Sequence, residues 1–129
     1  AISGSESQFA EAMNERARQI GLTGSTFRNS TGWPDPEHRT TARDLARLAK
    51  RIIVDFPDHY RYYNERSFRF NDISQDNRNP ALARVPGADG LKTGHTEEAG
   101  YGLTASAKRG ERRLILVFNG LPSMRARAE

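Results

Sequence analysis

A lysine and a threonine lie between two glycines in the stretch GLKTG at residues 90–94, part of the longer run GADGLKTGHTEEAGYGLTASA at residues 87–107. Glycine lets a ligand approach the backbone closely, while lysine and threonine supply an ammonium group and a hydroxyl group. This combination suits a phosphate-binding loop or one wall of an acyl-transfer site. The two hypotheses predict different classes of protein.

The phosphate-binding hypothesis fails on spacing. Such a loop has a glycine, four residues and then Gly-Lys-Ser/Thr ahead of a helix, because successive backbone N–H groups must curl around the phosphates. Here the residue before Lys92 is Leu91, and a segment of strand-like composition follows Gly94. The acyl-transfer hypothesis remains, although a match of three residues is not specific by itself.

Length and composition limit the other classes of function. With 129 residues the chain is long enough for one modest core, and it contains no cysteine, which excludes a disulfide scaffold and a thiolate metal site. Its net charge of +4 comes from basic residues interspersed with sixteen acidic ones. A dispersed excess without interleaved aromatic residues predicts a solvated surface and no nucleic-acid partner.

Two amphipathic helices are predicted in the first half. In the first, over residues 7–20, Gly21 follows as a C-cap and four apolar residues have helical spacing: Phe9, Met13, Ala17 and Ile20. The second begins with Thr41 as N-cap and ends before Pro57. Its apolar stripe consists of Leu45, Leu48, Ala49, Ile52 and Ile53. Residues 24–39 are rich in turn formers and predict a loop with one short strand at 26–29.

The second half has the period of a β-sheet. Residues 67–71 alternate aromatic and polar side chains, and the strand-like runs 100–107 and 112–119 are separated by a turn signal at 108–111. We predict that 87–94, 100–107 and 112–119 form three neighbouring antiparallel strands, and that a helix begins near residue 123. The fold class is therefore predicted to be α+β, an antiparallel sheet with helices packed on it.

The flanks of the Lys-Thr-Gly element make it specific. The segments STGW, TTARDLARLA, NRN at residues 77–79 and DGLKTGHTEEAGYGLTASA follow one another along the chain. Together they closely resemble, from Phe9 to Arg127, the D-alanyl-D-alanine carboxypeptidases among the low-molecular-mass penicillin-binding proteins. The resemblance implies part of a penicillin-binding-protein/β-lactamase-like transpeptidase domain, which uses no cofactor and no metal.

The resemblance also implies roles for the residues of the element. The Lys-Thr-Gly strand borders the active site, and a peptide ending in D-Ala-D-Ala lies along it by strand addition. Lys92 would be a catalytic residue that supplies positive charge and helps proton transfer. Thr93 would bind the terminal carboxylate of the substrate, and Gly94 would let the peptide backbone come close.

Three further site residues come from the same resemblance. The backbone N–H of His95 would be one of two oxyanion-hole donors, which makes His95 the second catalytic position. Arg127 matches an arginine that recognises the substrate carboxylate. Arg78 matches a position that lines the same cleft.

The nucleophile of the family is the serine of Ser-x-x-Lys, and no lysine here has a serine three residues before it. No asparagine has a serine two positions earlier, so the Ser-x-Asn element is also missing. We therefore expect residues 1–129 to be a single partial domain, the C-terminal portion of the catalytic domain. Its partner would be the N-terminal segment of the same protein, and this chain alone should be inactive.

The leading hypothesis is a serine carboxypeptidase that acts on peptidoglycan stem peptides through an acyl-enzyme and is inhibited by β-lactams. It would work in the periplasm or elsewhere outside the cytoplasm, with any membrane association provided by a segment outside this chain. The alternative is a non-catalytic module that binds D-Ala-D-Ala termini. A Ser-x-x-Lys encoded upstream of Ala1 would distinguish the two.

Overall fold

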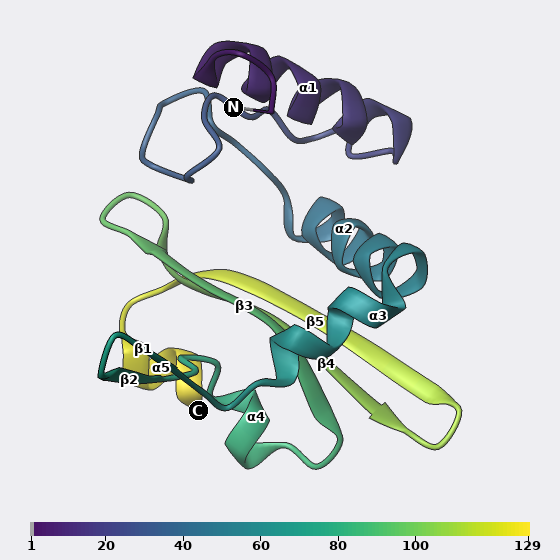
Figure 1. Cartoon of the computed structure of the whole chain (residues 1–129), viewed down its shortest axis with the longest axis vertical. Helices are drawn as coiled ribbons and strands as arrows, with labels where there is room; N and C mark the ends of the chain where they lie inside the picture. Colours follow the sequence, from purple (N-terminus) through teal and green to yellow (C-terminus); the bar gives the residue numbers. More distant parts are fainter. Residues whose placement is uncertain (1) are drawn as a thin grey trace.

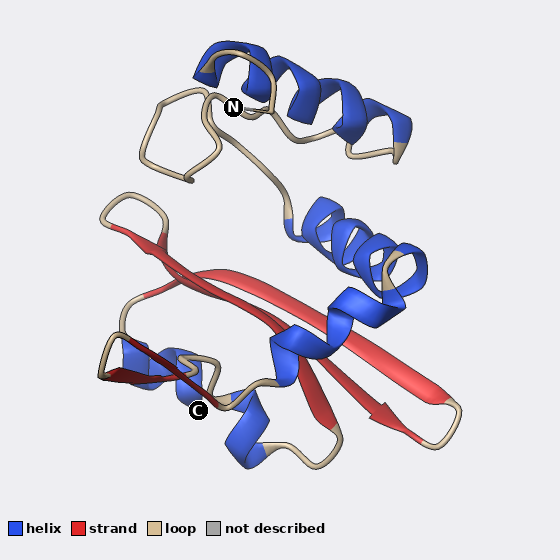
Figure 2. Cartoon of the chain, viewed as in Figure 1, coloured by secondary structure: helices blue, strands red, loops and turns tan. Residues whose placement is uncertain are grey.

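A three-stranded antiparallel sheet forms the centre of the computed structural model, which describes residues 2–129 (Figure 1). In chain order the elements are α1 (Glu6–Gln19), α2 (Ala42–Asp55), α3 (Pro57–Tyr60), the 3-10 helix η1 (Arg61–Asn64), β1 (Ser67–Phe70), β2 (Ile73–Asp76), α4 (Ala81–Arg84), β3 (Ala88–Thr96), β4 (Gly100–Arg109), β5 (Arg112–Leu121) and α5 (Met124–Ala128). Helices precede the large sheet and short helices flank it (Figure 2). The α+β class predicted from the sequence is confirmed.

Local sequence signals explain where the two long helices begin and end. Ser5 caps α1, and Gly21 just past its end has a φ of 79°. The N–H groups of Gly21 and Leu22 donate to carbonyl oxygens of the last turn, which is the Schellman arrangement that favours glycine. At α2, the Thr41 hydroxyl accepts from the backbone N–H of Asp44 at 3.1 Å. Both predicted caps are therefore confirmed.

The loop between α1 and α2 differs from the prediction of a strand at residues 26–29. Only an isolated bridge between Thr26 and Arg39 forms there. Side chains organise the rest of the loop. The Asn14 amide both donates to and accepts from the backbone of Phe27, and the buried Asp44 carboxylate accepts from the N–H of Gly24 at 2.8 Å. These local hydrogen bonds compete with a strand ladder, and the pairing stays limited to the single bridge between Thr26 and Arg39.

The large sheet has the order β3-β4-β5, with both pairs antiparallel, so β3 and β5 are its edges. This confirms the prediction of three neighbouring strands and places Lys92 within a strand. The predicted strand at 67–71 is β1, which pairs with β2 in a separate hairpin that the sequence analysis did not distinguish. Asn71 and Asp72 at its turn have φ values of 48° and 62°, the conformation of a type I′ turn.

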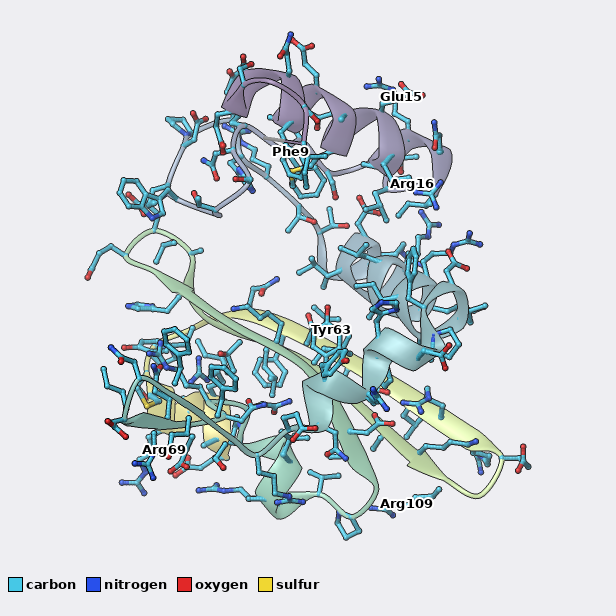
Figure 3. All side chains as sticks on the ribbon, in the orientation of Figure 1. Phe9, Glu15, Arg16, Tyr63, Arg69 and Arg109 are labelled. Carbon is cyan, nitrogen blue, oxygen red and sulfur yellow. The ribbon has the colours of Figure 1, made fainter. Side chains whose placement is uncertain are left out.

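The helices α2 and α3 lie between α1 and the sheet, and they cover one of its faces (Figure 1). The buried centre of this layer is formed by Ala49, Tyr60 and Leu91, and four partly buried residues pack around it: Ile52, Ile53, Tyr63 and Ile115. Tyr63 extends from η1 over the sheet (Figure 3). Leu114 and Leu116 on the edge strand β5 are 72% and 56% exposed.

Among residues 2–129, no helix combines the length and the hydropathy that a bilayer crossing requires.

Candidate active site

The Lys-Thr-Gly element lies in the middle of the edge strand β3. Because side chains alternate along a strand, Lys92 and Gly94 belong to one face, and Thr93 and His95 belong to the other. Across the ladder, Thr93 is paired with Leu103, and His95 is paired with Tyr101. The strand thus presents its candidate groups on both faces and leaves one backbone edge outside the ladder with β4.

A layered contact joins β3 to the C-terminal helix. The imidazole of His95 stacks on the ring of Tyr101, with centroids 3.9 Å apart and an interplanar angle of 11°. The guanidinium carbon of Arg127, in α5, lies 5.5 Å from the centroid of the same ring. The structure therefore brings His95 and Arg127, two of the predicted site residues, together through Tyr101.

Arg127 is buried without an anionic partner. The residue is 7% exposed, its Nε atom has no hydrogen-bond partner, and it takes part in none of the ion pairs among residues 2–129. Ser123 caps the short helix that carries it, accepting from the N–H of Ala126 at 3.0 Å. A buried charge without a partner is energetically costly, so this position favours an incoming anion.

Lys92 and Gly94 lie on the other face of the strand, and both are exposed. The Lys92 side chain is exposed, and its ammonium group donates to the carbonyl oxygen of Thr93. A Cβ atom added at Gly94 would meet nothing within 4 Å, and the φ of Gly94 is not positive. Neither the packing nor the backbone conformation of this chain therefore requires glycine at position 94.

Arg78 forms no ion pair or cation–π contact with the other candidates within residues 2–129. It is exposed in the segment between β2 and α4, next to the buried Asn79. None of the ion pairs or cation–π contacts among residues 2–129 links it to β3. Its place in the cleft remains a prediction.

A second group of residues, which sequence reasoning missed, fixes the start of β3. The Arg113 guanidinium donates to both carboxylate oxygens of Asp89 at 2.8 Å, and the Tyr60 hydroxyl donates to the same carboxylate at 2.9 Å. Arg113 also donates to the Ser106 hydroxyl. We call Tyr60, Asp89, Ser106 and Arg113 the anchoring network. It holds β3 three residues before Lys92.

Two pKa shifts follow from the anchoring network. The hydrogen bonds to Asp89 raise the pKa of Arg113 above its ordinary value. Burial, reinforced by the Asp89 carboxylate, raises the pKa of Tyr60 to about 12. The ordinary tyrosine value is about 10. Within the anchoring network, both shifts favour the protonated forms, which are the neutral tyrosine and the charged arginine.

Stability at alkaline pH should report on Tyr60. A folded-state pKa above the unfolded value stabilises the protein fully below pH 10, and the contribution disappears as pH rises from about 10 to about 12. The free energy of unfolding should fall across this window more steeply in the wild type than in Tyr60→Phe, where the titrating group is absent. Urea unfolding at several pH values measures both slopes. Equal slopes would show that Tyr60 titrates normally.

A shallow hollow of about 500 Å³ adjoins the end of β3. His95 lines it from β3, Glu97 and Glu98 line it from the β3–β4 turn, and Tyr101 and Leu121 line it from β4 and β5. The described part of the chain contains no group of three histidine, aspartate or glutamate side chains placed to hold a metal ion.

The fold and this site together define a domain of the penicillin-binding-protein and DD-transpeptidase class. The model of one peptidase family, S11, described as D-alanyl-D-alanine carboxypeptidase, matches residues 1–122. The chain belongs to this family.

Relatives and solved structures agree with this assignment. The D-alanyl-D-alanine carboxypeptidase DacA of Haemophilus influenzae is 43% identical over 128 residues, which cover 98% of this chain and 33% of the relative. A crystal structure of penicillin binding protein 5 from the same species matches with a TM-score of 0.93 at 43% identity, covering 98% of this chain and 38% of that one. The ampicillin-bound penicillin-binding protein D2 of Listeria monocytogenes matches at 27% identity with a TM-score of 0.86, over 94% and 51% of the two chains. The chain spans about one third of the length of the curated relatives it matches.

Proposed function

We propose that this chain supplies the Lys-Thr-Gly strand and the carboxylate-binding side of the active site in a serine D-Ala-D-Ala carboxypeptidase. The carrying observation is the buried, unpaired guanidinium of Arg127 on the face of the sheet that bears Thr93 and His95. The substrate of such an enzyme ends in a free carboxylate. Arginine and threonine together can bind it through charge-assisted hydrogen bonds, which are stronger than neutral ones.

The substrate peptide would extend along the free edge of β3. An edge strand offers backbone N–H and C=O groups to an added strand, and the pockets beside it select the side chains. Gly94 supports this placement, because the space beside it is empty of protein atoms. A peptide backbone there could approach β3 more closely than any side chain would allow.

The backbone N–H of His95 is proposed as an oxyanion donor. His95 and Tyr101 lie directly opposite each other in the β3–β4 ladder, and we place them in the non-hydrogen-bonded class of antiparallel pair, in which both N–H groups point away from the partner strand. In that class of pair the His95 N–H faces the free edge of β3. A scissile carbonyl oxygen held there would gain a donor as negative charge develops on it.

Lys92 would act from the opposite face of the strand. We propose that a serine in the Ser-x-x-Lys element, on the N-terminal segment of the same protein, attacks the carbonyl carbon of the penultimate D-alanine. The C–N bond to the last D-alanine breaks, and that residue leaves with the serine proton. The exposed ammonium group of Lys92 would stabilise the site's negative charge and assist this proton transfer. Water then hydrolyses the acyl-enzyme.

The same site would accept β-lactams as inhibitors, and the bound ampicillin reported for the Listeria relative supports this. We further propose that residues 1–129 are part of one catalytic domain, that Arg78 lines its cleft, and that the enzyme acts on peptidoglycan outside the cytoplasmic membrane. A non-catalytic module would instead bind D-Ala-D-Ala peptides without releasing D-alanine.

The proposed function is tested with Gly94→Ala in the complete protein that joins this chain to its Ser-x-x-Lys segment. The wild type should release D-alanine from a D-Ala-D-Ala peptide. The variant should lose about tenfold or more in kcat/KM, corresponding to roughly 1.4 kcal/mol, because the new methyl group occupies the substrate's path. Its melting temperature should stay unchanged, since within residues 2–129 no atom beyond the adjacent residues lies within 4 Å of that methyl group.

Two results would contradict the proposal. Binding of the peptide by the wild type without release of D-alanine would favour the non-catalytic module. Full activity of Gly94→Ala would show that the substrate does not approach β3 closely at this position. The matched control is Gly110→Ala in the β4–β5 turn, where a Cβ atom also has open space but φ is 56°. This control should lose stability and keep its KM.

A further inference from the structure

We propose that Tyr101 is a positioning residue for substrate recognition, whose ring holds Arg127 ready for the substrate carboxylate. This inference rests on the proposed function and assigns a role to a residue outside the Lys-Thr-Gly element. Tyr101 lies in β4, directly opposite His95, and its ring contacts both His95 of β3 and Arg127 of α5.

Two side chains from different elements lie against the Tyr101 ring. The imidazole of His95 is nearly parallel to it, with the ring centroids 3.9 Å apart. The guanidinium carbon of Arg127 lies over the same ring, 5.5 Å from its centroid. His95 thus supports the ring from β3, and the ring in turn supports the cation of α5.

The environment of the buried Arg127 differs from that of the half-buried Arg113. Arg113 is fixed by a bidentate ion pair with Asp89, which uses its N–H donors and neutralises its charge. Within residues 2–129, Arg127 has no such pair, and its Nε atom has no hydrogen-bond partner. An aromatic face attracts a cation without consuming its N–H donors. Tyr101 can therefore orient the guanidinium while leaving its charge and donors available to a substrate.

Orientation in advance matters because arginine has a long, flexible side chain. Fixing such a side chain at the moment of binding costs affinity, and a group already ordered avoids this cost. The hydroxyl group of Tyr101 forms no hydrogen bond among those found in residues 2–129. The aromatic face, rather than the hydroxyl group, is therefore the functional part of the side chain.

The test compares Tyr101→Leu with Tyr101→Phe in the complete protein, using a D-Ala-D-Ala peptide and the same peptide with its C-terminal carboxylate converted to an amide. Loss of a cation–π contact corresponds to roughly a 2- to 30-fold change in affinity. Tyr101→Leu should raise KM for the free peptide by about this factor and leave kcat and the reaction of the amide nearly unchanged. Tyr101→Phe should behave as the wild type.

A double-mutant cycle separates this inference from the proposed function. In an Arg127→Ala background, Tyr101→Leu should have little further effect, because the residue acts through Arg127. If Arg127→Ala discriminates between the two peptides and Tyr101→Leu does not, the inference is overturned while the proposed function stands. If Arg127→Ala itself does not discriminate, carboxylate recognition at this site fails and the inference falls with it.

A second substitution covers the case in which Tyr101→Leu does not fold. Tyr101→Met keeps apolar bulk with a flexible side chain and should give the same rise in KM. If both variants fail to fold while Tyr101→Phe folds, or if both lose activity equally on the two peptides, Tyr101 is a packing residue and the proposal is wrong.

Discussion

Replacing His95 by proline should lower kcat of the complete protein about 100- to 1,000-fold, which corresponds to the roughly 3 to 4 kcal/mol expected for one oxyanion-hole donor. Proline lacks the backbone N–H, so the substitution removes the proposed donor directly. The site tolerates proline better than most strand positions, because β3 is an edge strand and the His95 N–H is proposed to face away from the ladder. Single-turnover acylation by a D-Ala-D-Ala peptide measures the loss.

The matched control is His95→Ala, which keeps the backbone N–H and removes the imidazole. It should lose much less activity than His95→Pro. The remaining loss should be a rise in KM, because the imidazole ring that stacks on Tyr101 is absent. Thermal unfolding of both variants checks that proline has not disrupted the β3–β4 pairing. Equal losses in two folded variants would show that the imidazole, and not the backbone donor, contributes to catalysis.

Replacing Arg127 by alanine should reduce kcat/KM for peptides with a free C-terminal carboxylate about 10- to 100-fold, as expected when hydrogen bonds to a charged group worth roughly 1.5 to 3 kcal/mol are lost. On a peptide whose carboxylate is capped as an amide, Arg127→Ala should react nearly as fast as the wild type does on that same peptide. Steady-state kinetics on the two peptides gives the ratio directly. Equal losses on both peptides would exclude Arg127 from carboxylate recognition.

Arg127→Lys is the control for charge alone. Lysine carries the same charge as a point donor and cannot form the planar, bidentate contact of a guanidinium. It should therefore recover only part of the selectivity. Neither substitution should lower the melting temperature greatly, because Arg127 forms no ion pair within residues 2–129.

The two long helices and the large sheet followed from local patterns. The caps at Thr41 and Gly21 were predictable because a side-chain oxygen or a positive φ satisfies backbone groups that the helix itself cannot pair. The β1–β2 hairpin was missed because its turn residues, Asn71 and Asp72, lack the glycine that marks most type I′ turns. The predicted strand at 26–29 is wrong, since a strand also needs a neighbour to pair with.

The sequence by itself determined the family and the Lys-Thr-Gly element, because these residues are consecutive and their alternation on β3 follows from strand geometry. Only the tertiary structure decided which distant residues stand beside them. The contact of Tyr101 with Arg127 depends on where α5 packs, and the pairing of Asp89 with Arg113 depends on the register of three strands. The sequence contains seventeen arginines, and residue type alone does not show which of them binds a substrate. Burial distinguishes Arg127 from the arginines that are exposed to solvent.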